Sequence, residues 1–98
     1  MAFIDDYDFD LLVNEAEKMV LDELGEQLEQ YPKQLCTCND CVADMAAIAL
    51  NSVKPLYRYS LLGSLYAAQA MNEGSYAESV HKAVSAAIEK VRQNPSHD

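Results

Sequence analysis

The sequence is poor in basic residues and has no long apolar segment. Seven lysine and arginine residues stand against 16 aspartate and glutamate residues, which gives a formal net charge of −9. This balance argues against binding to nucleic acid polymers and to anionic membranes, because any anionic ligand would need a locally positive pocket. The longest uninterrupted apolar run, from Met45 to Leu50, is far too short to cross a bilayer.

Cysteine is scarce and odd in number, and the chain opens without a basic, apolar leader. Three cysteines argue against the disulfide framework of a secreted domain. Residues 1–10 are acidic, so we expect no signal peptide and a cytoplasmic location. The length predicts one domain, residues 1–98, whose core spans residues 8–93 between a loose acidic N-terminus and a loose C-terminal tail.

The spacing of apolar residues predicts a mainly α fold with four helices and one short strand. Asp8 or Asp10 can cap the first helix, which should end just before Pro32. Ser75 and Glu78 fit a capping box for the last helix. The helices are expected at about residues 8–31, 39–51, 65–72 and 75–94, and the strand at about residues 56–61.

The second expected helix is apolar on nearly every side. Between Val42 and Leu50 its one charged residue is Asp44. Such a helix must be covered on nearly all sides, and a chain of this length offers little cover. We therefore expect a second copy of the chain to cover part of it. The alternative is a monomer whose alanine-rich helix stays half exposed.

The expected strand at residues 56–61 points to the same assembly. A single strand leaves its backbone groups without partners. Pairing with the same strand of a second subunit across a twofold axis would satisfy them. The sequence therefore predicts a homodimer whose strands pair across that axis.

The middle of the chain carries a distinctive set of residues. It has a C-x-C-x-x-C run at residues 36–41, the run Ala-Ile-Ala-Leu-Asn at residues 47–51, and Val13, Asn14, Glu17, Asp44, Val53, Pro55 and Tyr57. Over roughly residues 11–66 this pattern resembles the late competence protein ComFB family. The resemblance implies a homodimer of mainly helical subunits with one short strand, a cysteine-bound zinc ion and no enzymatic activity. Some cyanobacterial members are receptors for cyclic dinucleotides.

Cys36, Cys38 and Cys41 are close enough in the sequence for three thiolates to hold one zinc ion. The start of the helix that follows would favour the thiolate form. Family members that bind zinc through four cysteines have one more than this chain, so a fourth ligand is needed. His81 is the first candidate, and the others are Asp40, Asp44, His97, water or a partner subunit. The alternatives are three reduced thiols packed as small hydrophobic groups, or a redox switch.

A second candidate site combines cationic and flat side chains within seven residues. Phosphate recognition needs ammonium or guanidinium groups, and base recognition needs planar ones. Such a site would suit cyclic di-GMP or cyclic di-AMP beside the expected twofold axis. Its residues are Lys54, Tyr57, Arg58, Tyr59 and Ser60. The alternative is that the tyrosines pack in the core and the cations are solvated, in a zinc-bound adaptor that binds an unidentified protein partner without a small ligand.

Catalysis has little support in the sequence. Cys41 and His81 could in principle form a nucleophile and its base, but three clustered cysteines are more typical of metal ligands. The sequence contains no phosphate-binding loop, dinucleotide fingerprint or metalloprotease motif. We therefore expect a protein that is not an enzyme.

Overall fold

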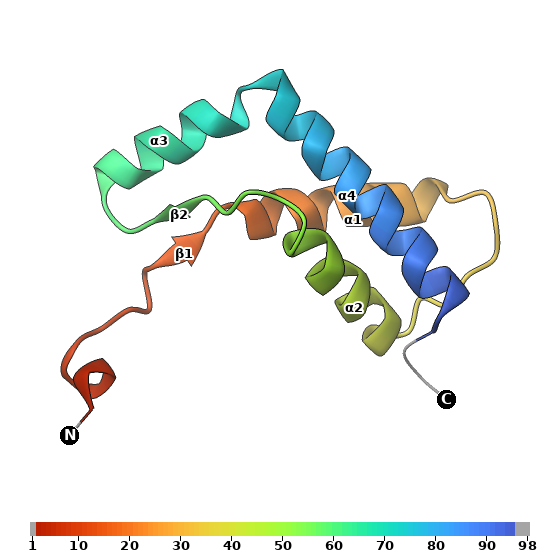
Figure 1. Ribbon diagram of the computed structural model, residues 1–98, viewed down its shortest axis with the longest axis horizontal. Helices are drawn as coiled ribbons and strands as arrows, with labels where there is room; N and C mark the ends of the chain where they lie inside the picture. Colours follow the sequence, from red (N-terminus) through yellow and green to blue (C-terminus); the bar gives the residue numbers. More distant parts are fainter. Residues whose placement is uncertain (1, 96–98) are drawn as a thin grey trace.

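A computed structural model describes residues 2–95 and confirms the mainly α prediction (Figure 1). Four α-helices, a short 3-10 helix and a two-stranded sheet lie within these residues. In chain order the elements are η1 (Phe3–Asp6), β1 (Val13–Asn14), α1 (Ala16–Gln30), α2 (Asn39–Leu50), β2 (Tyr57–Arg58), α3 (Leu61–Met71) and α4 (Gly74–Gln93). No helix in this part of the chain is long and apolar enough to span a membrane.

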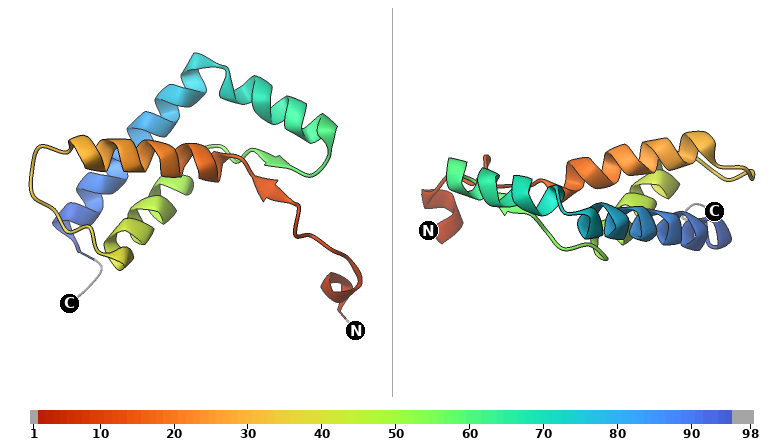
Figure 2. Two further views of the ribbon diagram at one scale, coloured as in Figure 1. Left: turned by 180° about the vertical axis from the view of Figure 1, so that it is seen from behind. Right: turned by 90° about the horizontal axis from the view of Figure 1, so that it is seen from above.

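The core lies between α1, α2 and α4. In Figures 1 and 2, α2 and α4 lie side by side and α1 crosses them. α1 and α2 contribute residues at spacings of four and α4 at spacings of three and four, which places them on one face of each helix. All of the following are at most 3% exposed: Ala16, Val20, Leu24, Cys41, Met45, Ala49, Val80, Val84, Ala87, Ile88 and Val91. The chain itself therefore covers one face of α2, and that face does not require a second copy.

The first helix begins at Ala16, so the predicted start at Asp8 or Asp10 is wrong. The residues directly before α1 form the short strand β1 and do not continue the helix. The side-chain oxygen of Asn14 holds them there, because it accepts hydrogen bonds from the backbone N–H groups of Ala16 (3.1 Å) and Leu56 (2.7 Å). These bonds tie the start of α1 to a segment 42 residues further along the chain. Apolar periodicity alone cannot reveal such a long-range contact.

The strand expected at residues 56–61 is reduced to β2, and its partner lies in the same chain. β2 pairs antiparallel with β1, Val13 opposite Arg58 and Asn14 opposite Tyr57. The next helix begins at Leu61, four residues earlier than predicted, because the Ser60 hydroxyl accepts a hydrogen bond from the backbone N–H of residue 63 (3.4 Å) and caps it. Pairing of the strands of two copies across a twofold axis stays a prediction. It is not required to satisfy the backbone of β2, because β2 already pairs with β1.

The last helix lies where the sequence predicts it, but its predicted capping box is wrong. α4 begins at Gly74, its N-cap Glu73 makes no side-chain cap hydrogen bond, and Ser75 lies inside the first turn. Glu78 instead forms an ion pair with Lys82 (3.2 Å). The tail expected at residues 96–98 lies outside the described residues.

A polar cluster joins the end of α1 to the last turns of α4. Arg92 Nη2 lies 2.8 Å from Glu89 Oε2, and the Tyr31 hydroxyl donates to the same carboxylate. The hydrogen bonds from Arg92 and then Tyr31 hold the pKa of Glu89 at about 2, below its ordinary value of 4.5. Glu89 therefore stabilises the fold in its ionised form.

Replacing Glu89 with glutamine is expected to lower stability at neutral pH and to remove part of the acid sensitivity. Because the pKa of Glu89 is depressed by folding, its contribution is complete above about pH 4.5 and is lost as the pH falls toward 2. Urea unfolding at pH 7, 4 and 2.5 should show the gap between wild type and variant closing with acidity. Glu26→Gln, a change at an exposed position of α1, is the matched control. A gap that is constant with pH would contradict this role.

Candidate functional site

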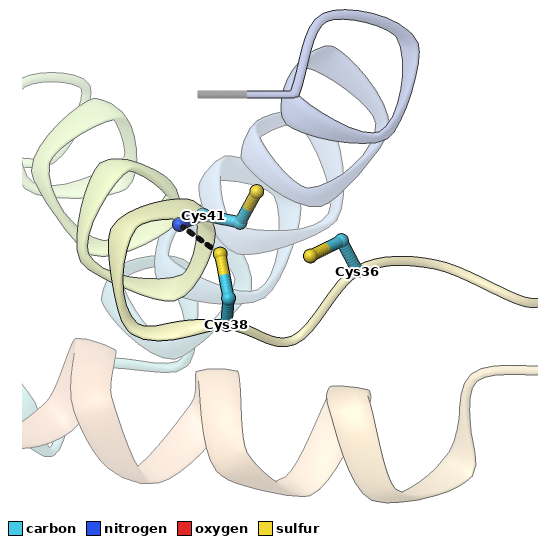
Figure 3. Close-up of side chains that lie close together, drawn as sticks. All are labelled: Cys36, Cys38 and Cys41. Carbon is cyan, nitrogen blue, oxygen red and sulfur yellow. Dashed lines mark hydrogen bonds between the residues drawn. The ribbon is translucent and has the colours of Figure 1, made fainter. Parts of the chain in front are cut away.

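Three cysteines gather where the loop after α1 meets the first turn of α2 (Figure 3). The Sγ atoms of Cys36, Cys38 and Cys41 all lie within 4.8 Å of one another. Around a tetrahedral zinc ion with Zn–S distances of about 2.3 Å, neighbouring sulfurs are about 3.8 Å apart. Small side-chain rotations would therefore bring the three sulfurs to the separations that zinc requires.

The cluster sits at the surface and at a helix N-terminus. Cys41 is buried, Cys36 is half-buried and Cys38 is exposed, so an ion can enter from the solvent side. Cys38 is the N-cap of α2, and its sulfur accepts a hydrogen bond from the backbone N–H of Cys41 (3.5 Å). This bond and the positive end of the helix dipole both favour the thiolate, which is the form that binds metal.

His81, the predicted fourth ligand, is not brought to the cysteines. Its Nδ1 lies 2.8 Å from Glu23 Oε2, and Gln27 donates to its backbone carbonyl (3.1 Å). His81 thus faces α1 from the first half of α4, whereas α2 begins near the end where α4 finishes (Figures 1 and 2). Gln93, the last residue of α4, lies twelve residues after His81. About 18 Å of helix therefore separates His81 from the end of α4 beside which α2 begins.

The other predicted ligands do not complete the cluster within residues 2–95. Asp40 and Asp44 are exposed on the first turns of α2, and neither joins the group of ligand atoms that lie within 4.8 Å of one another. His97 lies outside the described residues. The described part of the chain therefore offers three sulfur ligands, which fit a zinc ion whose fourth ligand comes from elsewhere.

The five residues predicted for a cyclic dinucleotide are divided among different surfaces. Tyr57 and Arg58 line a cavity of about 680 Å³ beside α1. Lys54 lines a different groove, beside α3, to which Tyr57 also contributes. Tyr59 faces the N-terminal residues, and Ser60 caps α3. The predicted set does not form one pocket in this chain.

Arg58 already has an anionic partner that the sequence did not indicate. Its Nε donates to Glu15 Oε1 at 2.6 Å, and Glu17 and Asp22 line the same cavity. A phosphate at Arg58 would have to displace Glu15 and approach two further carboxylates. Glu15 lies 43 residues from Arg58, and only the β1–β2 pairing brings them together.

The fold and the cluster define a small, mainly α protein with three cysteines close enough together to hold a metal ion. The family model described as "Late competence development protein ComFB" matches residues 13–95. The chain belongs to the ComFB family, which confirms the resemblance seen in the sequence.

A solved structure shares the fold of this chain. The structure of the late competence protein ComFB from Bacillus subtilis is similar, with a TM-score of 0.69 and 24% sequence identity. The similarity covers 87% of this chain and 92% of that one, so the two share a fold over nearly their whole length. None of the curated proteins matches the chain significantly.

Proposed function

We propose that this protein is a non-enzymatic, zinc-binding regulatory module that acts as a homodimer in the cytoplasm and binds a protein partner. The observation that carries the proposal is the convergence of three cysteine sulfurs at the N-terminus of α2. Thiolates are soft ligands that favour zinc over magnesium or calcium. With Cys41 buried in the core and Cys36 in the preceding loop, the ion would fasten that loop to the helices.

The shape of the chain supports a dimer. The molecule measures 46 × 38 × 18 Å and has a radius of gyration of 15.7 Å, against about 13 Å for a compact domain of this length. Its accessible surface of 6983 Å² exceeds the value for a compact monomer of this size by about 1400 Å². A standard interface buries about 800 Å² on each partner, so the excess is enough for one.

The location of exposed apolar side chains indicates where the second copy would bind. With the exception of Leu21, the large exposed apolar residues belong to the N-terminal segment, to β2 with the residue after it, and to α3. They are Phe3, Ile4, Tyr7, Phe9, Leu11, Leu12, Tyr57, Tyr59, Leu61, Leu62, Leu65 and Tyr66. These segments all adjoin the β1–β2 pair, and so many exposed large apolar side chains are typical of an interaction surface. We place the dimer surface here and not on α2.

Elemental analysis of the purified protein tests the metal part of the proposal. Protein from zinc-supplemented cells should carry close to one zinc ion per chain, because three preformed thiolate ligands bind the ion tightly. Wild-type protein without metal would overturn the proposal. A serine variant at Cys38, whose side chain is exposed, should lose the ion without losing core packing.

Cyclic dinucleotide binding is a second candidate function, favoured by one observation. Exposed Tyr57 and the Arg58 guanidinium line the same cavity, so a base could stack beside a phosphate contact. If this holds, Arg58→Ala should weaken the binding of cyclic di-GMP or cyclic di-AMP by at least ~100-fold, since each subunit loses a charge-assisted contact. Isothermal titration measures this.

Two further variants separate this candidate from chance binding. Glu15→Gln should strengthen binding, because it frees Arg58 and removes a carboxylate from the cavity. Lys82→Ala, a change at a cation of α4 that pairs only with Glu78 among the described ion pairs, should have no effect. Wild-type protein that binds neither nucleotide would leave the zinc-binding adaptor as the function.

A further inference from the structure

The N-terminal arm, residues 2–12, lies outside the region that matches the family model and projects from the body of the molecule (Figure 1). Its rings form an aromatic cluster: Phe3 lies 4.7 Å from Tyr7 and 6.2 Å from Phe9 between ring centroids. Each of the three is at least 44% exposed. The arm carries four aspartates and no basic residue. It is therefore both apolar and acidic.

The helix α3 presents an apolar surface without any charge of its own. Leu61, Leu62, Leu65 and Tyr66 share one face and are 60–78% exposed, while Ala67 on the opposite face is buried. α3 contains no acidic and no basic residue. This face has no covering layer within residues 2–95.

A groove runs along α3 beside β2. Its volume is about 330 Å³, and its lining residues are Lys54, Pro55, Leu56, Tyr57, Tyr66, Ala67, Gln69, Ala70 and Glu73. Lys54 forms no ion pair with the described part of the chain, whereas Arg58 is neutralised by Glu15. The groove, which we call the α3 groove, therefore has apolar walls with one available cation at its rim and one carboxylate, Glu73.

We propose that the N-terminal arm of each copy lies across α3 of the other copy, with an aromatic side chain in the α3 groove and an aspartate near Lys54. This inference rests on the homodimer proposed above and names the segments that exchange. A Phe or Tyr side chain buries 150–250 Å² when it is enclosed, and the groove is large enough for one ring.

The partner's arm fits this groove better than the chain's own arm does. No residue of the arm lines the α3 groove. In Figures 1 and 2 the arm and α3 diverge from the β1–β2 pair to opposite sides. A twofold axis beside β1 and β2 would place each arm over the other copy's α3 and cover both apolar surfaces at once.

Electrostatic repulsion favours contact of each arm with α3 of the other copy over contact between the two arms. Two arms in contact would bring eight aspartates together, because each arm contributes Asp5, Asp6, Asp8 and Asp10. The uncharged face of α3 imposes no such repulsion, and in the groove Lys54 attracts a carboxylate against a single opposing carboxylate, Glu73.

Photo-crosslinking of the full-length protein tests the exchange directly. With p-benzoylphenylalanine in place of Tyr7, irradiation should give a product with the mass of two chains. Peptide mapping should join the arm to a segment within residues 54–73. A product with the mass of one chain would show the arm on its own body, and arm-to-arm products would show the wrong partner; either overturns the exchange.

A double substitution measures how much the arm contributes. Phe3→Ser with Phe9→Ser should raise the dimer dissociation constant by at least ~100-fold, since each of the two arms loses two of the aromatic rings that would lie across α3. Both residues are exposed in the single chain, so the fold should be unchanged by circular dichroism. Leu21→Ser, at an exposed apolar position of α1, is the control and should leave dimerisation unchanged.

Sedimentation of the wild type and of the double variant distinguishes failure of the homodimer from failure of the arm exchange. Wild-type protein that sediments as a single chain at about 100 μM, where any dimer with a low-micromolar dissociation constant would be assembled, would overturn the homodimer and the exchange together. A wild-type dimer whose dissociation constant is unchanged by the double substitution would overturn the exchange alone.

Discussion

Replacing Cys36 with serine is expected to abolish zinc binding and to lower the melting temperature by at least ~10 °C. A structural ion that binds only the folded state contributes its binding free energy to stability, and ~1 kcal/mol corresponds to 4–8 °C for a domain of this size. Cys36 is only half-buried, so loss of packing contributes little. Differential scanning calorimetry with parallel metal analysis measures both effects.

Chelation provides the matched control for this result. Wild-type protein stripped of metal should melt near the temperature of Cys36→Ser, and adding chelator to the variant should change nothing further. Cys41→Ser should be less stable than either, because Cys41 is 1% exposed and also packs in the core. If chelation leaves the melting temperature of the wild-type protein unchanged, the metal does not stabilise the fold.

Replacing Leu65 with glutamate is expected to dissociate the dimer while leaving each chain folded. Leu65 is 60% exposed in the single chain, so the glutamate remains solvated there. In the dimer the charge would be buried against apolar side chains without a partner. The dissociation constant should rise at least ~1000-fold, which corresponds to ~4 kcal/mol. Analytical ultracentrifugation measures it.

A change on α2 gives the contrasting result. Ala49 is fully buried within its own chain, so Ala49→Glu should unfold the protein and not merely separate two copies. Leu65→Met, which keeps the volume and polarity, should dimerise like wild type. If Leu65→Glu stays dimeric, the interface lies away from α3.

The fold was predictable where local pattern and tertiary packing agree. The faces of α2 and α4 follow from apolar spacings that the core uses directly, as at Met45, Val84 and Val91. The start of α1 was not predictable, because Phe9 and Leu12 continue a helical spacing although they lie in a turn before β1 and outside any helix. What stops the helix is Asn14 bound to Leu56, a contact between distant segments.

The site was predictable to the extent that its ligands are neighbours in the sequence. Cys36, Cys38 and Cys41 could hardly lie far apart, and the sulfurs do converge. The placement of His81 depends on how α4 packs on α1, which no local spacing encodes. For the same reason the sequence could not show that Glu15 neutralises Arg58.

The exposed tyrosines show a further limit of local pattern. Alternation at Tyr57 and Tyr59 was consistent with a half-buried strand, yet both side chains are more than 60% exposed. β2 has one neighbouring strand and no covering layer on that side. In the homodimer proposed above, these exposed side chains would form part of the interface with the second copy.

Native mass spectrometry of the wild-type protein reports both the metal and the assembly in one spectrum. We expect a species with the mass of two chains and two zinc ions. Acidification should release the ions and leave the mass of single chains. A native spectrum that shows only one metal-free chain would rule out both the zinc site and the dimer.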